Sequence, residues 1–522
     1  MARFGAIDIG SNAMRLRIVE VERPKGERAS DRVSGLTDAT EVSSQRASVR
    51  LGREVFQTGS LALSAIDEAV DALRGFRTIL DAAQVDSYRA VATSATREAR
   101  NGPVLVARAA SEAGISVEVI EGVEEARLVQ LAVRRKVPFG EQRALLVDLG
   151  GGSTELTLLQ GGEPRAAQSL KLGTVRLLEA FFDGDGAVDR WHQNLVTEFL
   201  ARVGDGISPE FFEEKPDLII ATGGNLEALA AICPLRSPLG PAIDLAAARV
   251  LLDRLVTMSK LERAAAFRLR ADRADTILPA IWILLSLCEA ASDHVLVPGT
   301  GLRDGLLEDL MDVHFRPRKD GGECHILGAC LRLGRRYRFD EKHGTHVASL
   351  ATRLFDDLAP RHGLCPRDRT LLSASALLHD VGEFVRNGAH HKHSQYIIEH
   401  SEIMGLTPGE RRLVANVARY HRKSFPDAAH RSFRDLGEGD RVKVRSLSAI
   451  LRLADALDRE HLGKVADVTA AVEGGKLRLH VSGAPDHELE DWTVARKGEL
   501  FTAVFGLKVE VVDDRAPGAL SS

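Results

Sequence analysis

The sequence has 522 residues, of which 44% are hydrophobic and 27% are charged, and its net charge is −5. At about 150 residues per domain this length predicts three to four domains, and the composition excludes collagen-like, fully disordered and disulfide-scaffold proteins. With this net charge the protein has no overall positive potential that would attract nucleic acid or an anionic membrane. A polyanionic ligand therefore has to be bound at a local site.

Short β-branched runs alternate with amphipathic stretches in the first part of the chain, a pattern typical of α/β proteins. Strands are predicted in FGAIDIG, AMRLRIVEVE, SYRAVATSA and ISVEVIEG, and a helix in LALSAIDEAVDALRGFRTILDAA. Near residue 144, ALLVDLGGGSTELTLLQGG repeats the strand, acidic-glycine turn and strand of FGAIDIGSNAMRLRIVEVE. The repeat predicts two related domains, residues 1–135 and 136–312. Residues 23–48 are polar, and we expect a mobile hairpin or loop insertion there.

The chain changes character near residue 315, where HFRPRKDGGE has the Pro, Gly and charge content of a linker. Only His192 and His294 of the 17 histidines precede residue 310. This asymmetry indicates that the two parts of the chain carry different chemistry. Residues 320–465 are predicted to form an all-α domain, because HVASLATRLFDDLA and LSAILRLADALD have helical apolar spacing. KLRLHV and ELFTAVFGLKVEVV alternate like strands, so residues 466–522 are predicted to form a small α/β region.

The cysteines and the N-terminus indicate the compartment. The five cysteines have no CxxC spacing, which is typical of reduced, mostly buried thiols in a cytoplasmic protein. The N-terminal MARFGAIDIGSN lacks a basic region followed by a long apolar stretch, and no run of about 18 apolar residues occurs. We therefore expect a cytoplasmic protein with neither a membrane nor a nucleic acid as its partner.

Two turns of similar composition are candidate phosphate sites. In the first, Asp8 and Gly10 are followed by Ser11 and Asn12 between two predicted strands. Backbone N–H groups in such a turn cradle phosphate oxygens, although a single copy also fits a plain hairpin turn. The second turn begins 140 residues later and contains Asp148, Gly150, Gly151, Gly152, Ser153, Thr154 and Glu155. The pair indicates a cleft between two related domains that holds a polyphosphate from both sides.

Two further segments lie between these turns. Thr93, Ser94 and Arg97 follow a predicted strand, at the end where α/β proteins bind ligands, and arginine suits phosphate through its fork of donors. Glu124 and Glu125 begin a predicted helix after the strand ISVEVI. Acidic side chains near a helix N-terminus also interact favourably with the helix dipole, and this explains the two glutamates equally well without any function.

The ordered motifs DIGSN, ATSATREA, IEGVEEARL, DLGGGSTEL, LKLGTVRL, ATGGNLEAL and PGTGLRDGLL resemble the exopolyphosphatase and guanosine pentaphosphate phosphohydrolase family. The resemblance covers residues 1–312. It implies duplicated ribonuclease H-like domains of the actin-like ATPase type, an active-site cleft between them, and Mg²⁺-dependent hydrolysis of a terminal phosphate.

The resemblance also implies roles for individual residues. Glu125 matches the carboxylate that orients the attacking water, with Glu124 as the fallback. Asp148 and Glu155 match acidic positions linked to Mg²⁺ and water, and Asp8 is a weaker candidate. The implied phosphate-binding residues are Asp8, Gly10, Ser11, Asn12, Thr93, Ser94, Arg97 and Gly150 to Thr154. Lower in rank are Lys171, Arg176, Gly223 and Gly224.

A second set of candidate ligands lies in the predicted helical domain. His343, the pair His379-Asp380 and Asp455 resemble the ordered ligands of the HD superfamily of metal-dependent phosphohydrolases. Any one histidine is more often a surface or core residue, but imidazole and carboxylate groups from separate helices suit Mn²⁺, Fe²⁺, Zn²⁺ or Mg²⁺. Two-metal members carry extra histidines, which match His393 and His421. His346 beside His343, and His390 and His391 beside His393, leave the register open.

Four functions compete on this sequence. The leading hypothesis is an exopolyphosphatase that acts on inorganic polyphosphate, and the second is hydrolysis of pppGpp to ppGpp. A sensor that binds polyphosphate or a nucleotide without turnover is a third, and a kinase has a smaller weight. Long-chain processivity favours a basic groove that uses Arg335, Arg336 and Arg338, although a solvated helix face explains this run as well. The family resemblance implies a homodimer.

Overall fold

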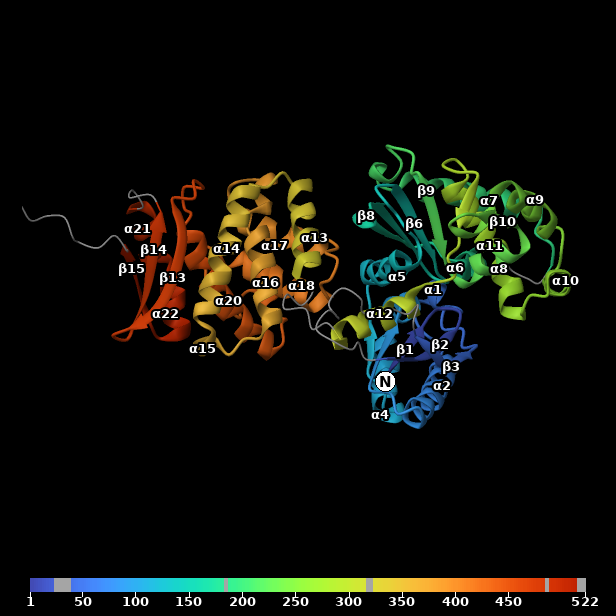
Figure 1. Ribbon diagram of the computed structural model, residues 1–522, viewed down its shortest axis with the longest axis horizontal. Coiled ribbons are helices and arrows are strands. Elements are labelled where there is room, and N and C mark those ends of the chain that lie inside the picture. The colour runs from blue at the N-terminus through green and yellow to red at the C-terminus, as the bar shows by residue number, and fades with distance from the viewer. Residues whose placement is uncertain (23–38, 183–185, 316–322, 484–487, 514–522) are drawn as a thin grey trace, which may run out of the picture. The chain divides into compact units, whose positions relative to one another are not determined.

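The computed structural model of the chain describes residues 1–22, 39–182, 186–315, 323–483 and 488–513 (Figure 1). The chain divides into two compact units, Met1–Arg318 and Lys319–Ser522, called unit 1 and unit 2 here. The predicted divisions between residues 135 and 136 and between residues 465 and 466 stay predictions.

Unit 1 is built from two mixed sheets and the helices that cover them (Figure 1). Its strands are β1 (Ala2–Ile9), β2 (Met14–Val21), β3 (Thr40–Ala47), β4 (Ser87–Ala92), β5 (Val117–Val119), β6 (Arg143–Leu149), β7 (Thr154–Gln160), β8 (Glu163–Leu170), β9 (Leu218–Thr222), β10 (Pro234–Ser237), β11 (Gly240–Asp244) and β12 (His294–Leu296). Its helices are α1 (Val55–Thr58), α2 (Leu63–Ala82), α3 (Ser94–Glu98), α4 (Gly102–Ala113), α5 (Gly122–Lys136), α6 (Thr174–Phe181), α7 (Arg190–Asp205), η2 (Pro209–Phe211), α8 (Gly224–Ile232), α9 (Leu245–Leu255), α10 (Lys260–Phe267), α11 (Ala271–Cys288) and α12 (Leu302–Phe315).

The two sheets repeat one topology. The first has the order β3-β2-β1-β4-β5, and the second contains β8-β7-β6-β9-β12, extended by β11 and β10. In each, the opening hairpin is antiparallel and the next strand along the chain joins it in parallel, as β4 joins β1 and β9 joins β6. This correspondence fits the predicted duplication of an α/β domain.

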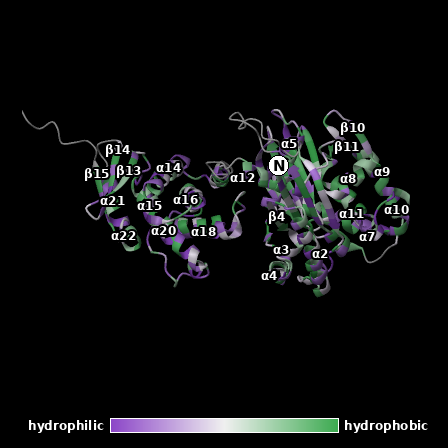
Figure 2. Ribbon diagram, turned by 60° about the horizontal axis from the view of Figure 1, so that its bottom comes forward, coloured by the Kyte–Doolittle hydropathy of each residue, from purple (hydrophilic) through white to green (hydrophobic). Residues whose placement is uncertain are grey.

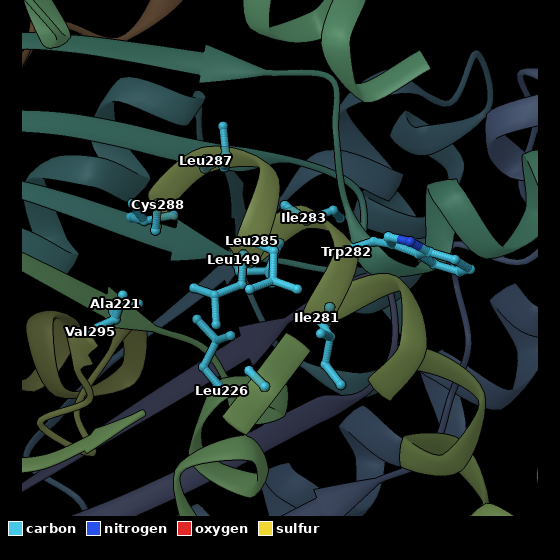
Figure 3. Close-up of a cluster of buried hydrophobic side chains, with 14 of the residues drawn as sticks. Leu149, Ala221, Leu226, Ile281, Trp282, Ile283, Leu285, Leu287, Cys288 and Val295 are labelled. Atoms are coloured by element: carbon cyan, nitrogen blue, oxygen red, sulfur yellow. The ribbon is translucent and has the colours of Figure 1, made fainter. Parts of the chain in front are cut away.

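The core of the second sheet positions the end of β6, where the second predicted phosphate turn begins. Every residue of β6 after Arg143 is buried, which fits a strand covered on both faces. Helix α11 is buried along almost its whole length, and its Ile281 and Leu285 lie near Leu149 of β6 and Leu226 of α8 (Figure 3). In Figure 2 the strands beside α5 are largely hydrophobic.

Unit 2 combines a group of helices with a small sheet of order β13-β14-β15 (Figure 1). This arrangement fits the predicted helical region followed by an α/β region. Its elements are α13 (Glu323–Arg336), α14 (Glu341–Asp357), α15 (Ala359–His362), α16 (Pro366–Leu378), η3 (Val381–Phe384), α17 (His390–His400), α18 (Pro408–Arg419), α19 (Arg431–Arg434), α20 (Glu438–Ala456), β13 (Val465–Glu473), β14 (Lys476–Gly483), α21 (Glu488–Lys497), α22 (Glu499–Phe505) and β15 (Lys508–Asp513).

The segment predicted as a hairpin or loop insertion contains a strand. Residues 23–38 lie outside the described residues, but Thr40–Ala47 form β3, which pairs with β2 at the edge of the first sheet. Of the two predicted alternatives over residues 23–48, a hairpin or a loop insertion, the antiparallel pairing of β3 with β2 fits the hairpin. Its sequence TEVSSQRA is mostly exposed, so this edge strand lacks the buried apolar alternation by which strands are predicted.

Two expectations concern the chain as a whole. Among the described residues, no helix has both the length and the apolar character that a membrane span needs. Of the described cysteine side chains, Cys233, Cys288 and Cys330 are buried and Cys365 is exposed, and all four are free thiols. The prediction of reduced, mostly buried cysteines is confirmed for these four.

Candidate functional site

The two predicted phosphate turns have the same hydrogen bond and face one cavity of unit 1. The backbone N–H of Gly10 donates to the carbonyl of Ala13 at 3.2 Å, and that of Gly150 donates to the carbonyl of Ser153 at 3.0 Å. Both turns line a cavity of about 250 Å³, called the cleft cavity here. The predicted residues that line it are Asp8, Gly10, Ser11, Asn12, Thr93, Ser94, Glu125, Asp148, Gly150, Gly151 and Ser153.

Contacts between the turns explain the small residues. The hydroxyl groups of Ser11 and Ser94 lie 3.0 Å apart and join β1 to α3. A Cβ atom at Gly151 would lie 3.1 Å from that of Ser11, and one at Gly152 would lie 2.3 Å from the hydroxyl of Ser94. Larger residues would separate the two halves of the site, so the glycine run is required by close approach.

Three buried carboxyl groups meet at this site. The ligand oxygens of Glu125, Asp148 and Glu155 all lie within 4.8 Å of one another. Asp148 of β6 and Glu155 of β7 are opposite each other in an antiparallel strand pair. Glu125 lies in the first turn of α5. The Asp148 carboxylate accepts a hydrogen bond from Thr222 at 2.6 Å, which orients it.

The structure distinguishes the two adjacent glutamates. Glu124 accepts hydrogen bonds from Arg127 at 2.7 Å and Arg89 at 3.3 Å, and it is not among the residues that line the cleft cavity. Glu125 lines the cavity, and its Oε2 is buried without a hydrogen-bond partner among the described residues. The nearest guanidinium group, that of Arg97, is 3.9 Å away. Glu125 rather than Glu124 is therefore available to a ligand.

Burial raises the pKa of each carboxyl group in this cluster. It raises the pKa of Asp148 to about 6, and together with the charge of Asp148 it raises the pKa of Glu155 to about 8. Burial, followed by the charges of Glu155 and Asp148, holds the pKa of Glu125 well above its ordinary value. Like charges this close favour protons or a cation between them.

The carboxylate cluster fits a divalent cation. Oε2 of Glu155, like that of Glu125, is buried and has no hydrogen-bond partner among the described residues. Carboxylate oxygens are the ligands that Mg²⁺ prefers in proteins. The donor set therefore fits the Mg²⁺ ion that the family resemblance implies.

Three arginines that the sequence did not single out also line the cleft cavity. Arg15, Arg273 and Arg303 line the cleft cavity and form no ion pair with any described carboxylate. Burial and the positive charge of Arg15 lower the pKa of Arg303, and burial and nearby arginines lower that of Arg273. Gly224 leaves room for two of them, because a Cβ atom there would lie 3.0 Å from the guanidinium groups of Arg15 and Arg273. An anion would relieve this repulsion.

Of the other predicted residues, some support the site through hydrogen bonds and two line the cavity. Arg97 donates to the carbonyl of Ile120 at 2.6 Å, and Arg176 donates to that of Gly152 at 2.8 Å. Thr154 donates to the carbonyl of Leu172 at 2.5 Å. Gly223 and Gly224 line the cavity. The three arginines of the predicted basic groove, Arg335, Arg336 and Arg338, are exposed in unit 2, so the groove stays a prediction.

The predicted ligands of unit 2 converge as well. Nε2 of His379 lies 3.2 Å from Nε2 of His343, 3.5 Å from Oδ2 of Asp380, and 3.7 Å from Oδ1 of Asp455. Asp340 caps α14 by accepting from the backbone N–H of His343 at 3.1 Å, which fixes that histidine in the first turn. Burial lowers the pKa of His379, but the charges of Asp380 and Asp455 outweigh it and raise the pKa to about 9.

A second group adjoins the first and corrects one prediction. Oδ1 of Asp380 lies 3.1 Å from Nε2 of His390 and 3.4 Å from Nε2 of His421. His393, the predicted ligand, is half-buried and lies outside this group, because α17 begins at His390 and turns that residue inward. His346 instead contacts the carbonyl of Val465 at 2.8 Å. We call His343, His379, Asp380, His390, His421 and Asp455 the unit 2 cluster.

Known protein families match residues in both units of the chain. Residues 30–314 match the Ppx/GppA phosphatase family, and residues 328–496 match Ppx/GppA phosphatase, domain III. The guanosine-5'-triphosphate,3'-diphosphate pyrophosphatase of Vibrio vulnificus is 27% identical over 484 residues, which cover 92% of this chain and 91% of that protein. The protein of that name from Aliivibrio fischeri is 26% identical and covers 92% of each chain.

A solved structure is similar to part of the chain. The crystal structure of an exopolyphosphatase from Cytophaga hutchinsonii has 26% sequence identity and a TM-score of 0.53, and it covers 59% of this chain and 98% of its own. This likeness confirms the predicted actin-like ATPase type of α/β fold. The HD-like assignment of the helical region stays a prediction.

Proposed function

This chain belongs to the Ppx/GppA phosphatase family, whose members hydrolyse phosphoanhydride bonds, and we propose that it is an exopolyphosphatase. It removes the terminal phosphate of inorganic polyphosphate by attack of water. Each turnover converts one water and a chain of n phosphates into inorganic phosphate and a chain of n − 1.

The observation that carries this proposal is the composition of the cleft cavity. Buried carboxyl groups, arginines without an ion pair and two glycine turns together line this cavity. None of the described residues that line the cavity is aromatic, so nothing there offers a stacking surface to a purine. A chain of phosphates without a base fits this lining best.

The roles of the residues follow from their positions. Backbone N–H groups of the two turns, with Arg15, Arg273 and Arg303, bind phosphate oxygens and neutralise their charge. Glu125 accepts a proton from water as the water oxygen attacks the terminal phosphorus and the P–O bond to the next phosphate breaks. Burial and the charges of Glu155 and Asp148 raise the pKa of Glu125, which makes it a stronger base than an ordinary glutamate.

A divalent metal ion completes this site, since enzymes of the family are divalent-metal-dependent phosphatases. We propose that the ion is Mg²⁺ and that Asp148 and Glu155 hold it, with Asp8 nearby. When bound, it supplies positive charge that neutralises the phosphate oxygens. Asp8 remains the weaker candidate, because Arg15 and Arg303 already act on its charge.

Hydrolysis of pppGpp to ppGpp is the second candidate function. The curated relatives that match more than nine-tenths of this chain carry the name of that pyrophosphatase. The same carboxylates and arginines would act on its terminal phosphate. We also propose, for unit 2, that its cluster binds divalent metal ions, and we keep the family's homodimer as an expectation.

Phosphate release from long-chain polyphosphate and from pppGpp, measured side by side with Mg²⁺, tests the proposal. We expect faster release from polyphosphate, and we expect Glu125→Gln to lower kcat by about 10² to 10⁴ with either substrate, because the general base is lost. Glu124→Gln is the matched control, since the neighbouring glutamate lies outside the cleft cavity.

Three results would contradict parts of this proposal. Faster release from pppGpp would identify the second candidate as the function. Tight polyphosphate binding without turnover would favour a sensor. Equal activity of wild type and Glu125→Gln would remove the proposed base and with it the assignment of chemistry to the cleft.

A further inference from the structure

Two carbonyl groups of the second predicted phosphate turn are held by the start of α6. The backbone N–H of Thr174 donates to the carbonyl of Gly150 at 3.1 Å, and that of Val175 donates to the carbonyl of Gly151 at 2.7 Å. A Cβ atom at Gly173, which caps α6, would lie 2.4 Å from the same Gly151 oxygen. The backbone of the helix therefore lies directly against the backbone of the turn.

A side chain holds the third carbonyl group in this row. Nε of Arg176, in the first turn of α6, donates to the carbonyl of Gly152 at 2.8 Å. In a trans peptide the C=O group and the following N–H point in opposite directions, so the N–H of Ser153 points away from Arg176. Among the described residues this N–H has no backbone acceptor. Ser153 lines the cleft cavity and Arg176 does not, so the N–H is left to a ligand.

The glycine at this position makes the orientation of the peptide easy to lose. Gly152 has no Cβ atom, so rotation of the peptide between Gly152 and Ser153 meets few steric barriers. After a full reversal, the carbonyl oxygen would point where the N–H points now. A carbonyl oxygen repels the oxygens of a phosphate, whereas an N–H group binds them. The orientation of this one peptide therefore decides whether the turn attracts or repels a phosphate at this point.

The Arg176 guanidinium is fixed on two further sides. Its Nη2 donates to the Glu98 carboxylate at 2.5 Å, and its Cζ lies 4.0 Å from the centroid of the Phe56 ring. The side chain is only 16% exposed, so these contacts hold it within the protein. Glu98 ends α3, which begins at Ser94 of the cleft cavity and follows β4 of the first sheet. Arg176 thus connects the second turn to the half of unit 1 that carries the first turn.

We propose that Arg176 is a positioning residue, which locks the peptide between Gly152 and Ser153 with its N–H toward the phosphates of the substrate. Arg176 itself does not contact phosphate, because its guanidinium is paired with Glu98 and lies outside the cleft cavity. This inference rests on the phosphate binding proposed for the cleft. It holds for polyphosphate and for pppGpp alike, since both end in a chain of phosphates.

Binding of inorganic tripolyphosphate with Mg²⁺, measured by titration calorimetry, tests this role. The parent protein is Glu125→Gln, so that the ligand is not hydrolysed during the measurement. Arg176→Met keeps the packing against Phe56 but has no donor for the Gly152 carbonyl. We expect this second substitution to raise the Kd about tenfold, which is the scale of one well-placed hydrogen bond.

Arg176→Lys and Arg202→Ala complete the set of variants in the same parent. Lysine keeps a donor but cannot reproduce the fork that bonds Gly152 and Glu98 together, so we expect a Kd raised about threefold. Arg202→Ala is the matched control, because Arg202 forms its ion pair with Glu198 at 2.6 Å on the exposed surface of α7. We expect it to have the parent Kd.

The number of binding sites per chain separates positioning from folding. A partly unfolded variant binds fewer ligands with the parent Kd, whereas a misplaced peptide lowers the affinity of every site. The parent Kd in Arg176→Met or in Arg176→Lys would overturn the role of Arg176, whatever number of sites the variant retains. A parent protein that binds no tripolyphosphate would overturn the phosphate site proposed for the cleft, and this inference with it.

Discussion

The buried carboxyl group of Glu155 couples folding of unit 1 to pH. Its pKa is about 8 in the folded chain, against an ordinary value of 4.5. Between these values the folded, metal-free protein binds more protons than the unfolded chain, so the free energy of unfolding falls as pH rises. A metal ion that replaces those protons has its greatest effect at the upper end of the range.

We therefore expect the stability of Mg²⁺-free protein to fall between pH 6 and pH 8, with up to about 1.4 kcal/mol per pH unit from Glu155 alone. Glu155→Gln should lose this part of the slope, and Mg²⁺ should stabilise wild type more at pH 8 than at pH 6. Urea unfolding at three pH values, with and without Mg²⁺, measures both effects. Glu163→Gln, on the exposed start of β8, is the control. Identical slopes for wild type and Glu155→Gln would contradict the argument.

Single residues were predictable where a local motif carries them. Asp8, Asp148 and Glu125 stand beside glycine turns or at a helix start, and all three line the cleft cavity. Arg15 and Arg303 were missed because they come together only in the folded chain, one from β2 and one from α12. Arg15 stands directly across from Asp8 in the β1 and β2 hairpin, a pairing that the repeated turn could have indicated.

Helix α5 holds Glu125 in place partly because α12 approaches it closely. A Cβ atom at Gly305 of α12 would lie 1.9 Å from the backbone carbonyl oxygen of Leu128 in α5. A backbone atom in the middle of a helix cannot move aside as a side chain can. The contact between these two helices therefore depends on glycine at this position.

We expect Gly305→Ala to force α5 and α12 apart, to destabilise unit 1 by about 1 to 3 kcal/mol, and to lower polyphosphate hydrolysis at temperatures where the protein stays folded. Gly75→Ala is the matched control, because Gly75 lies inside α2 with no atom within 4 Å of its added Cβ, and alanine favours a helix. Thermal unfolding and initial rates of polyphosphate hydrolysis, measured on both variants, test these two expectations. Equal stability of the two variants would show that the contact is dispensable.

Elements were predictable where apolar residues recur at a fixed spacing. The hairpins of β1 with β2 and of β6 with β7 follow from their buried runs, and so do the long helices α2 and α20. The start of α17 was not, because HHKH places three histidines within one turn. Ala389 has a left-handed backbone (φ 64°) immediately before the helix, and this determines that His390 faces the cluster.

Each proposed site lies within one unit of the chain. The cleft cavity uses residues between Asp8 and Asp304, and the unit 2 cluster uses residues between His343 and Asp455. Separate hydrophobic cores support them, since Ile281 is fully buried in unit 1 and Leu372 is fully buried in α16 of unit 2. Damage to one core should therefore leave the other site intact.

Leu372→Ala removes buried methyl groups and should destabilise unit 2 by about 2 to 5 kcal/mol. We expect calorimetry to show one transition moved to lower temperature, with loss of the metal ions held by unit 2 and unchanged polyphosphate hydrolysis below that transition. Ile281→Ala should give the reciprocal result, because its side chain contributes only to the core beneath β6. A single transition that shifts equally in both variants would instead mean that the two units unfold together, and the two sites would then not be separable by damage to either core.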